Sequence, residues 1–230
     1  MKTIGIIGGT SWESTVTYYQ IMNERVKEAC GGLSSAKLLL YSVNFAEVES
    51  HMSAGEWDDV ARILGDAAVR LEKGGADFIV LATNTLHIVI DSIASRVSIP
   101  FIHIADATAD AIIEKGYKKV ALLGTRFTMT EGFIKDRITA RGIEVLVPNS
   151  EAITRIDDII FKELCLGIIK EESRHYYESV IEDMKAAGAE GVILGCTEIG
   201  MLISSDNSAL PVFDTAVIHP EAAVKAALSD

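Results

Sequence analysis

Residues 75–85 read GADFIVLATNT, and residues 188–198 read GAEGVILGCTE. Each stretch contains a helix-ending Gly-Ala, an acidic residue, a short apolar run typical of a buried strand, and a polar tip. When the two stretches are aligned without gaps, Thr83 falls on Cys196. This match indicates a duplicated α/β unit in which the two residues occupy equivalent places.

Two further pairs of segments match in the same order. IGIIG at residues 4–8 corresponds to VALLG at residues 120–124, and IPFIH at residues 99–103 corresponds to LPVFD at residues 210–214. Buried parallel strands resemble one another in any α/β protein, which is the alternative explanation. Three matches in one order favour internal duplication.

Short apolar runs alternate with longer segments of helical spacing along the whole chain. This alternation predicts parallel sheets flanked by helices. We expect an α/β fold with two pseudo-symmetric lobes, each a parallel-type sheet flanked by helices, and an active site in the cleft between the lobes. The first lobe is predicted to contain residues 1–100 and 213–230, and the second residues 101–212. Helices are predicted at residues 87–97, after the first polar tip, and at residues 220–228.

Composition excludes several classes of protein. The chain has 230 residues, a formal net charge of −12 at pH 7 and a hydrophobic fraction of 49%. The negative charge argues against a nucleic-acid or anionic-membrane partner, and no apolar run is long enough for a membrane span. Three cysteines without a C-x-x-C spacing indicate a reducing compartment and neither a disulfide framework nor a zinc site. We therefore expect a cytoplasmic protein.

Ligands of parallel α/β sheets bind beyond the carboxyl ends of the strands. Hydroxyl groups and exposed backbone N–H groups at these ends suit a carboxylate. The motifs G-x-G-x-x-G and G-x-x-x-x-G-K-[ST] are absent, so no nucleotide cofactor is expected, and no histidine has the spacing of a metal ligand. The polar residues that follow the predicted strands are Thr10, Ser11, Thr83, Asn84, Thr85, Thr125, Thr128, Cys196 and Thr197.

Cys196 is the candidate for reactive chemistry. A thiol at a strand end that leads into a helix N-terminus is expected to have a lowered pKa, because the helix dipole and free N–H groups favour thiolate. Thiolate can act as a base or a nucleophile. The alternatives are a small core residue for Cys196 and a backbone-capping role for Thr83. Their equivalent places in two repeats favour a functional role.

At and just after the predicted strand ends, the chain carries the motifs GGTSWEST at 8–15, YY at 18–19, TNT at 83–85, GT at 124–125, TM at 128–129 and GCTE at 195–198. Taken together, these motifs resemble those of the aspartate/glutamate racemase family. The resemblance covers essentially the whole chain and implies two similar lobes, no pyridoxal phosphate and a homodimer. It implies an isomerase that racemises a small, acidic amino acid. In the symmetric members two cysteines flank the substrate's α-carbon: one removes the α-proton as thiolate, and the other protonates the opposite face.

The chain departs from the family pattern at the first cysteine, where it has Thr83. A threonine hydroxyl is too weak an acid to exist as alkoxide at neutral pH, although it can donate a proton to a carbanion. The resemblance therefore implies that Cys196 abstracts the α-proton from one enantiomer and that Thr83 reprotonates the other face. We expect kinetically asymmetric turnover.

The resemblance also implies a set of substrate contacts. The α-carboxylate and the amine are assigned to Asn84, Thr85 and Thr197, and the opposite wall to Thr10 and Ser11. The second lobe adds Thr125 and Thr128. A side-chain carboxylate needs a basic partner, for which the sequence offers Arg126, Lys162 and Lys170. The alternative for each is a solvated surface charge, and a neutral or broader amino-acid specificity remains open.

Two other functions remain open. A single cysteine suits a decarboxylase or isomerase of a small dicarboxylic acid, in which Cys196 protonates one face of an enediolate or attacks an alkene. A catalytically weak amino-acid-binding protein is the non-enzymatic alternative. Cofactor-free racemisation, CO₂ release from substituted malonates, and tight binding without turnover distinguish the three.

Overall fold

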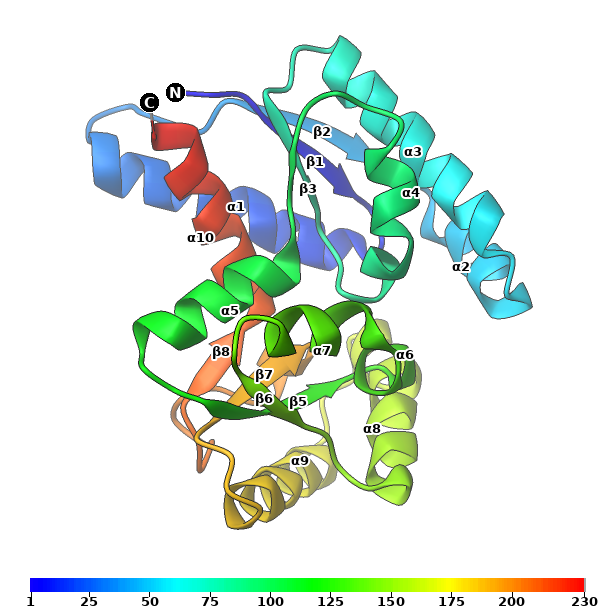
Figure 1. Ribbon diagram of the computed structural model, residues 1–230, viewed down its shortest axis with the longest axis vertical. Helices are drawn as coiled ribbons and strands as arrows, with labels where there is room; N and C mark the ends of the chain where they lie inside the picture. The colour runs from blue at the N-terminus through cyan, green and yellow to red at the C-terminus, as the bar shows by residue number, and fades with distance from the viewer. Residues whose placement is uncertain (230) are drawn as a thin grey trace. The chain divides into compact units, whose positions relative to one another are not determined.

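The structure, a computed structural model, describes residues 1–229 (Figure 1). Contacts divide the chain into two compact units: Met1–Ile104 together with the C-terminal segment from His219, and Ala105–Ile218. Each unit contains one four-stranded parallel sheet flanked by helices, so the predicted α/β class is confirmed.

The first unit has the strand order β2-β1-β3-β4. Side chains of α1 and of α10 (Thr215–Leu228) pack on one face of the central strands, and those of α2, α3 and α4 pack on the other. Because both faces are covered, every residue of β1 and β3 is buried. The elements are β1 Ile4–Gly8, α1 Trp12–Cys30, β2 Leu38–Ser42, α2 Phe45–Ala54, α3 Trp57–Lys73, β3 Phe78–Leu81, the 3₁₀ helix η1 Thr85–Val89, α4 Ile90–Ala94 and β4 Phe101–Ile102.

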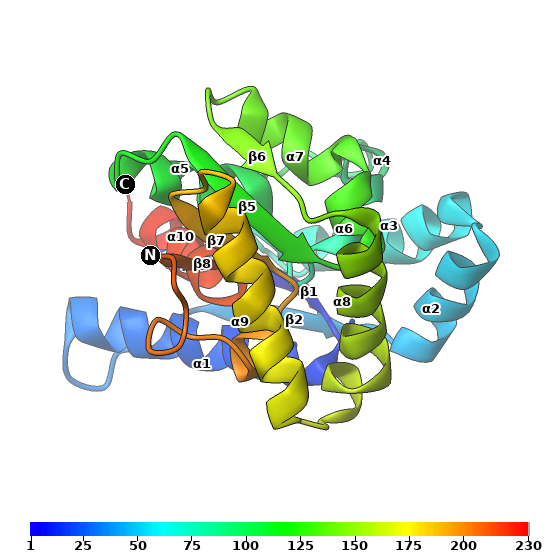
Figure 2. The same cartoon turned by 90° about the horizontal axis from the view of Figure 1, so that it is seen from below.

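The second unit repeats this order as β6-β5-β7-β8. Helices α8 and α9 lie side by side and share one apolar cluster with β5 and β7 (Figure 2). The elements are α5 Ile104–Glu114, β5 Lys119–Gly124, α6 Arg126–Thr130, α7 Gly132–Thr139, β6 Glu144–Leu146, α8 Ser150–Lys162, the 3₁₀ helix η2 Leu164–Leu166, α9 Glu171–Ala186, β7 Gly191–Gly195, the 3₁₀ helix η3 Ile199–Met201, β8 Val212–Asp214 and α10 Thr215–Leu228. Helix α10 runs from the second unit into the first.

The acidic residue of each repeated stretch has the same structural role. The Thr3 N–H donates to Asp77 Oδ2 at 2.6 Å, and the Lys118 and Lys119 N–H groups donate to Glu190 Oε2 at 2.6 and 3.0 Å. Each carboxylate thus anchors the segment that leads into the first strand of its sheet. The shared strand order and these shared contacts support the duplication.

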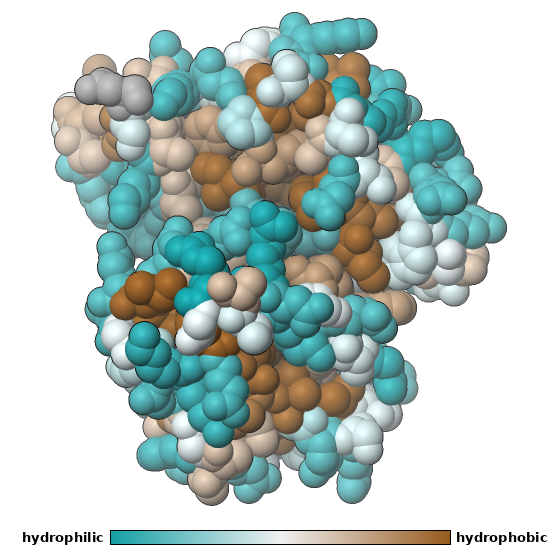
Figure 3. All heavy atoms as spheres, in the orientation of Figure 1, coloured by the Kyte–Doolittle hydropathy of each residue, from teal (hydrophilic) through white to brown (hydrophobic). Residues whose placement is uncertain are grey.

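Two helices differ from the prediction. Residues 85–94 form a 3₁₀ helix followed by a short α-helix, not one helix at 87–97. Helix α10 begins at Thr215, so Pro220 lies inside it and not at its start. Proline removes one backbone hydrogen bond there, a cost that the packing of Ala223, Val224 and Ala227 against the first sheet offsets. On the outside, apolar areas interrupt a mostly hydrophilic surface in both units (Figure 3).

Candidate active site

The turn after β1 places Thr10 and Ser11 at the start of α1. Gly9 has a φ of +91°, and a Cβ there would lie 2.3 Å from the Val43 carbonyl oxygen, so the turn requires glycine. Ser11 is the N-cap of α1, and its Oγ accepts a hydrogen bond from the Ser14 N–H at 3.4 Å. Thr10 is 8% exposed, and its Oγ1 has no hydrogen-bond partner among residues 1–229. Thr10 therefore has a polar atom that the fold itself does not use.

The second polar tip follows β3. Thr83 and Asn84 are buried, whereas Thr85 is partly exposed. The Thr83 N–H donates to the Leu81 carbonyl at 2.8 Å, which turns the chain sharply after the strand. Since β1 and β3 are parallel neighbours, this tip and the β1 turn lie at the same edge of the sheet. The structure thus gathers the five predicted residues of the first unit at one edge.

His87 fixes the backbone at Thr83. Its Nδ1 lies 2.7 Å from the Thr83 carbonyl oxygen, and its Nε2 lies 3.3 Å from the Ile104 N–H. A carbonyl only accepts and an amide N–H only donates, so the ring is neutral with its proton on Nδ1. Burial holds the pKa of His87 well below its usual value, with a further lowering from His103 and His219. This role is not predictable from the sequence, because the contact with Ile104 joins residues far apart along the chain.

His219 is a second buried, neutral histidine of the first unit. Its Nε2 donates to the Ile102 carbonyl at 2.8 Å, and its Nδ1 accepts from the Tyr18 hydroxyl at 2.9 Å. Burial lowers the pKa of His219 to about 4. The ring ties α10 to α1 and to the end of β4.

In the second unit, Thr125 and Thr128 follow β5. Thr125 is the N-cap of α6, and its Oγ1 accepts from the Thr128 N–H at 3.3 Å. The two hydroxyl oxygens lie 3.1 Å apart, and Thr128 is fully buried. Because β5 and β7 are parallel neighbours, these residues share one sheet edge with Cys196 and Thr197. Their side chains already contribute to the fold at this edge.

Cys196 is the first residue after β7 and is 8% exposed. Its Sγ donates to Glu198 Oε2 at 3.0 Å, and the Thr197 hydroxyl donates to the same oxygen at 2.9 Å. Glu198 is buried as well. The place of Glu198 two residues after the cysteine is the one sequence signal for this contact, which the predicted site residues did not include.

The prediction of a lowered pKa for Cys196 is wrong. Burial raises the pKa of the thiol well above its usual value, and the nearby Glu198 carboxylate raises it further. The helix that directly follows Cys196 is the 3₁₀ helix η3, which is only three residues long, and the next α-helix, α10, begins only at Thr215. The group that faces the sulfur is therefore an anion and not a helix N-terminus. At rest, the structure favours a protonated thiol.

The three basic candidates all lie in the second unit with partners nearby. Lys162 Nζ lies 2.8 Å from Asp158 Oδ1, and Lys170 Nζ lies 3.0 Å from Glu163 Oε1. An Arg126 guanidinium nitrogen donates to a threonine hydroxyl at 3.3 Å. None of these contacts identifies one of them as the partner of a substrate carboxylate.

One cluster has the composition of a metal site. Atoms of His51, Glu56 and Asp59 lie within 4.8 Å of one another on the surface of α2 and α3. Asp59 already pairs with Arg62 at 2.9 Å, and this cluster lies on helices and not at the strand ends.

Across residues 1–229, no helix is long and apolar enough to cross a membrane.

Residues 7–223 match the family described as Asp/Glu/Hydantoin racemase. The chain belongs to this family, which confirms the resemblance seen in the motifs and implies an isomerase.

Its similarity to individual proteins agrees with this membership. A candidate Asp/Glu racemase from Yersinia pestis has a solved structure with 48% sequence identity and a TM-score of 0.94, and both chains are covered completely. An aspartate racemase homologue from Pyrococcus horikoshii gives 38% identity and a TM-score of 0.87, again over the full length of both chains. A broad-specificity amino-acid racemase from Bacillus subtilis is 25% identical over 174 residues, which are 75% of this chain and 74% of the relative.

Proposed function

We propose that this protein is a cofactor-independent amino-acid racemase of the aspartate/glutamate type. It would abstract and return a proton at the substrate's Cα without pyridoxal phosphate. Family membership and the racemase relatives support the reaction class. The observation that carries the proposal is the contact of the Cys196 thiol with the buried Glu198 carboxylate at a strand end.

Glu198 offers the Cys196 thiol a route to thiolate despite its raised pKa. A free thiolate beside a carboxylate anion is disfavoured. If the Sγ proton moves along the existing hydrogen bond to Glu198 Oε2, the product is a thiolate beside a neutral carboxylic acid, and the net charge is unchanged. The thiolate then takes the α-proton of the substrate, which leaves a carbanion at Cα.

Thr83 is proposed to relay a proton from water to the opposite face of Cα: its hydroxyl gives its proton to the carbanion and takes one from water, so that no alkoxide is left. His87 holds the backbone of Thr83 in place, and Thr83 is 9% exposed. Because the hydroxyl is a far weaker acid than a thiol, almost none of it is alkoxide at neutral pH. The neutral hydroxyl is a poor base, so Thr83 is ill suited to remove the α-proton in the reverse reaction. A catalyst cannot change the equilibrium between enantiomers, so any one-way behaviour is kinetic.

The proposed substrate is a small amino acid, with an acidic side chain preferred. Asn84, Thr85 and Thr197 are the proposed contacts of the α-carboxylate and amine, and Thr10 is a contact on the first unit. The buried Thr10 Oγ1 supports this assignment, because a polar ligand atom would supply the hydrogen bond that residues 1–229 do not provide.

The test is hydrogen exchange at Cα in D₂O, followed separately for each enantiomer of aspartate and glutamate. We expect exchange without added cofactor, faster from one enantiomer, with Cys196→Ala abolishing it. Thr83→Cys should raise exchange from the slower enantiomer, since a thiol forms a basic thiolate near neutral pH far more readily than a hydroxyl forms an alkoxide. Equal rates from both enantiomers of the native protein would refute the asymmetric assignment, and full activity of Cys196→Ala would refute the role of the thiol.

The protonated resting thiol gives one alternative specific support. A decarboxylase of a small dicarboxylic acid needs a proton donor and no base, since loss of CO₂ itself generates the enediolate. Cys196 with its raised pKa suits that role. CO₂ release from substituted malonates, without exchange of amino-acid Cα protons, would favour this alternative.

A further inference from the structure

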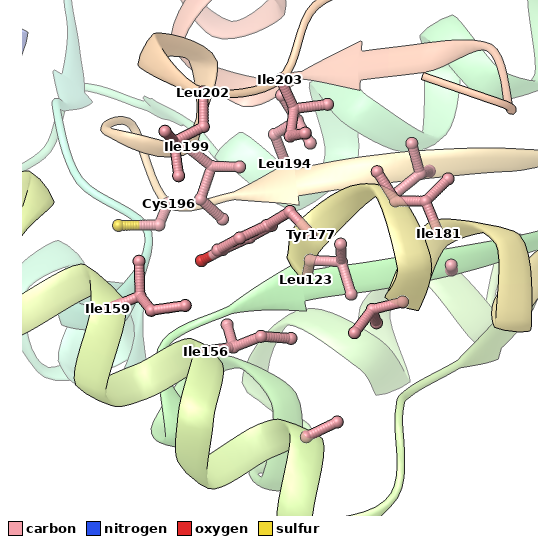
Figure 4. Packing of buried hydrophobic residues seen from close by; sticks show 14 of the residues in the cluster. Leu123, Ile156, Ile159, Tyr177, Ile181, Leu194, Cys196, Ile199, Leu202 and Ile203 are labelled. Atoms are coloured by element: carbon pink, nitrogen blue, oxygen red, sulfur yellow. The ribbon is translucent and has the colours of Figure 1, made fainter. Parts of the chain in front are cut away.

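A second polar group lies in the apolar core that surrounds Cys196. Tyr177, on α9, is 0% exposed and belongs to the same buried cluster as Cys196 and Ile159. The hydroxyl end of its ring points to the side of the cluster where Cys196 and Ile159 lie (Figure 4). Within residues 1–229 this hydroxyl has no hydrogen-bond partner.

Packing does not explain the hydroxyl of Tyr177. Phenylalanine would fill nearly the same volume without burying an unpaired polar group, which is unfavourable for folding. After burial, Cys196 is the next largest cause of a pKa of Tyr177 well above its usual value. Tyr177 therefore remains a neutral hydrogen-bond donor, electrostatically coupled to the thiol.

We propose that Tyr177 is a positioning residue for the Cys196 thiol: its hydroxyl donates a hydrogen bond to Sγ when the thiol has passed its proton to Glu198. This inference rests on the proposed function of Cys196. The proton leaves Sγ for Glu198 Oε2, Tyr177 keeps its own proton, and the cysteine side chain changes rotamer to bring the sulfur to the new donor.

The interaction discriminates between the two states of the sulfur. A neutral thiol is a weak acceptor, whereas a thiolate forms a charge-assisted hydrogen bond about twice as strong as a neutral one. The charged groups that act on Tyr177 include Asp157 and Glu163, and both are acids. Neither of these two groups can stabilise a thiolate, whereas the hydroxyl of Tyr177 can donate a hydrogen bond to it.

The test is Tyr177→Phe, with Tyr176→Phe as the matched control. Tyr176 is the adjacent residue on α9, and its ring packs against the Arg155 guanidinium with 4.7 Å between group and ring centre. Both variants are made with Cys30→Ser and Cys165→Ser, because these two thiols are exposed and would react as well. The measurements are the pH profile of Cys196 alkylation by iodoacetamide, the Cα exchange kinetics and the Tm.

For Tyr177→Phe we expect the apparent pKa of the thiol to rise by about one unit and alkylation at neutral pH to slow about tenfold. The kcat of exchange should fall by a similar factor with KM unchanged, and the Tm should stay the same or rise. Tyr176→Phe should leave the alkylation profile unchanged.

An alkylation profile of Tyr177→Phe that matches the parent would overturn the inference, and a lowered Tm with that unchanged profile would assign the hydroxyl a structural role. The alkylation measurement needs no substrate. A protein without exchange activity whose thiol pKa still depends on Tyr177 would therefore refute the racemase proposal and leave the Tyr177–Cys196 contact intact.

Discussion

Glu198 has two opposing effects on Cys196. Its charge raises the pKa of the thiol, and its Oε2 accepts the hydrogen bond from the Sγ that is proposed to lose the proton. A carboxylate so close to a reactive thiol is unfavourable for thiolate unless it also takes the proton. The two effects predict that reactivity towards an alkylating agent and catalytic turnover respond in opposite directions when the carboxylate is removed.

Glu198→Gln separates these effects. The amide carries no charge, so the pKa of Cys196 should fall and alkylation by iodoacetamide at neutral pH should become faster. The amide also cannot take a proton, so Cα exchange should slow by about a hundredfold or more, the usual contribution of a general base. Glu182→Gln, an exposed position on α9, is the control and should change neither rate. Cα exchange in Glu198→Gln that keeps the parent's rate would contradict the proton-transfer role.

At the scale of the elements, the strands were the predictable part. Continuous apolar runs fix β1, β3, β5 and β7, and the Gly-Ala-acid stretches mark where two of them begin, because Asp77 and Glu190 bind the same backbone groups in each half. The segment after β3 was not predictable as a 3₁₀ helix. Its geometry depends on His87, which reaches the distant backbone at Ile104.

The electrostatics at the end of β7 was likewise not predictable from spacing. The polar tip of the stretch that ends in Cys196 suggested a helix N-terminus, whereas the chain forms only the short helix η3 and turns Glu198 back to the sulfur. A carboxylate two residues from a thiol can point to it or away from it. Only the path of the backbone decides between a lowered and a raised pKa.

The ends of β5 and β7 approach too closely for side chains. A Cβ on Gly195 would lie 2.8 Å from a Leu122 methyl carbon and 3.0 Å from the Leu123 carbonyl oxygen. Gly195→Ala should therefore force the end of β7 to shift, which costs about 1–3 kcal/mol and displaces Cys196. We expect a lower Tm in thermal unfolding and a fall in Cα exchange larger than the loss of folded protein explains. An unchanged Tm would show that the strand end tolerates the methyl group.

At the scale of the whole chain, the two units repeat one topology with different polar groups at equivalent tips. In the first unit Thr83 follows β3, and its carbonyl contacts the buried His87. In the second unit Cys196 follows β7, and its thiol contacts the buried Glu198. The duplicated fold thus supplies two equivalent positions with very different acid–base strength. The two units also differ in the buried titratable groups on which their stability depends.

The two units should respond oppositely to mild acid. His219 in the first unit has a pKa lowered from 6.5 to about 4, whereas half-buried Asp214 in the second has a pKa raised from 3.8 to about 6. A buried histidine that favours the neutral form stabilises the fold fully above pH 6.5, and this contribution is lost as the pH falls towards 4. A carboxyl group with a raised pKa has the opposite sign: its contribution is lost as the pH rises from 3.8 to 6.

Between pH 6.5 and 4.5 we therefore expect the first unit to become less stable while Asp214 adds stability to the second. The shift of His219 corresponds to a loss of up to about 3 kcal/mol over its full range, and His87 adds to it in the same direction. Backbone hydrogen–deuterium exchange, followed by mass spectrometry across this range, resolves the two units. Protection in β1 and β3 should fall faster on acidification than protection in β5 and β7.

His219→Gln identifies the group responsible. Glutamine can keep the donation to the Ile102 carbonyl but cannot gain a proton, so the variant should be less stable at pH 7, because packing is lost, yet show a weaker dependence on pH. His175→Gln, an exposed position on α9, is the matched control and should keep the full dependence of the parent. If His219→Gln keeps the parent's slope between pH 6.5 and 4.5, the buried histidine is not the group that titrates.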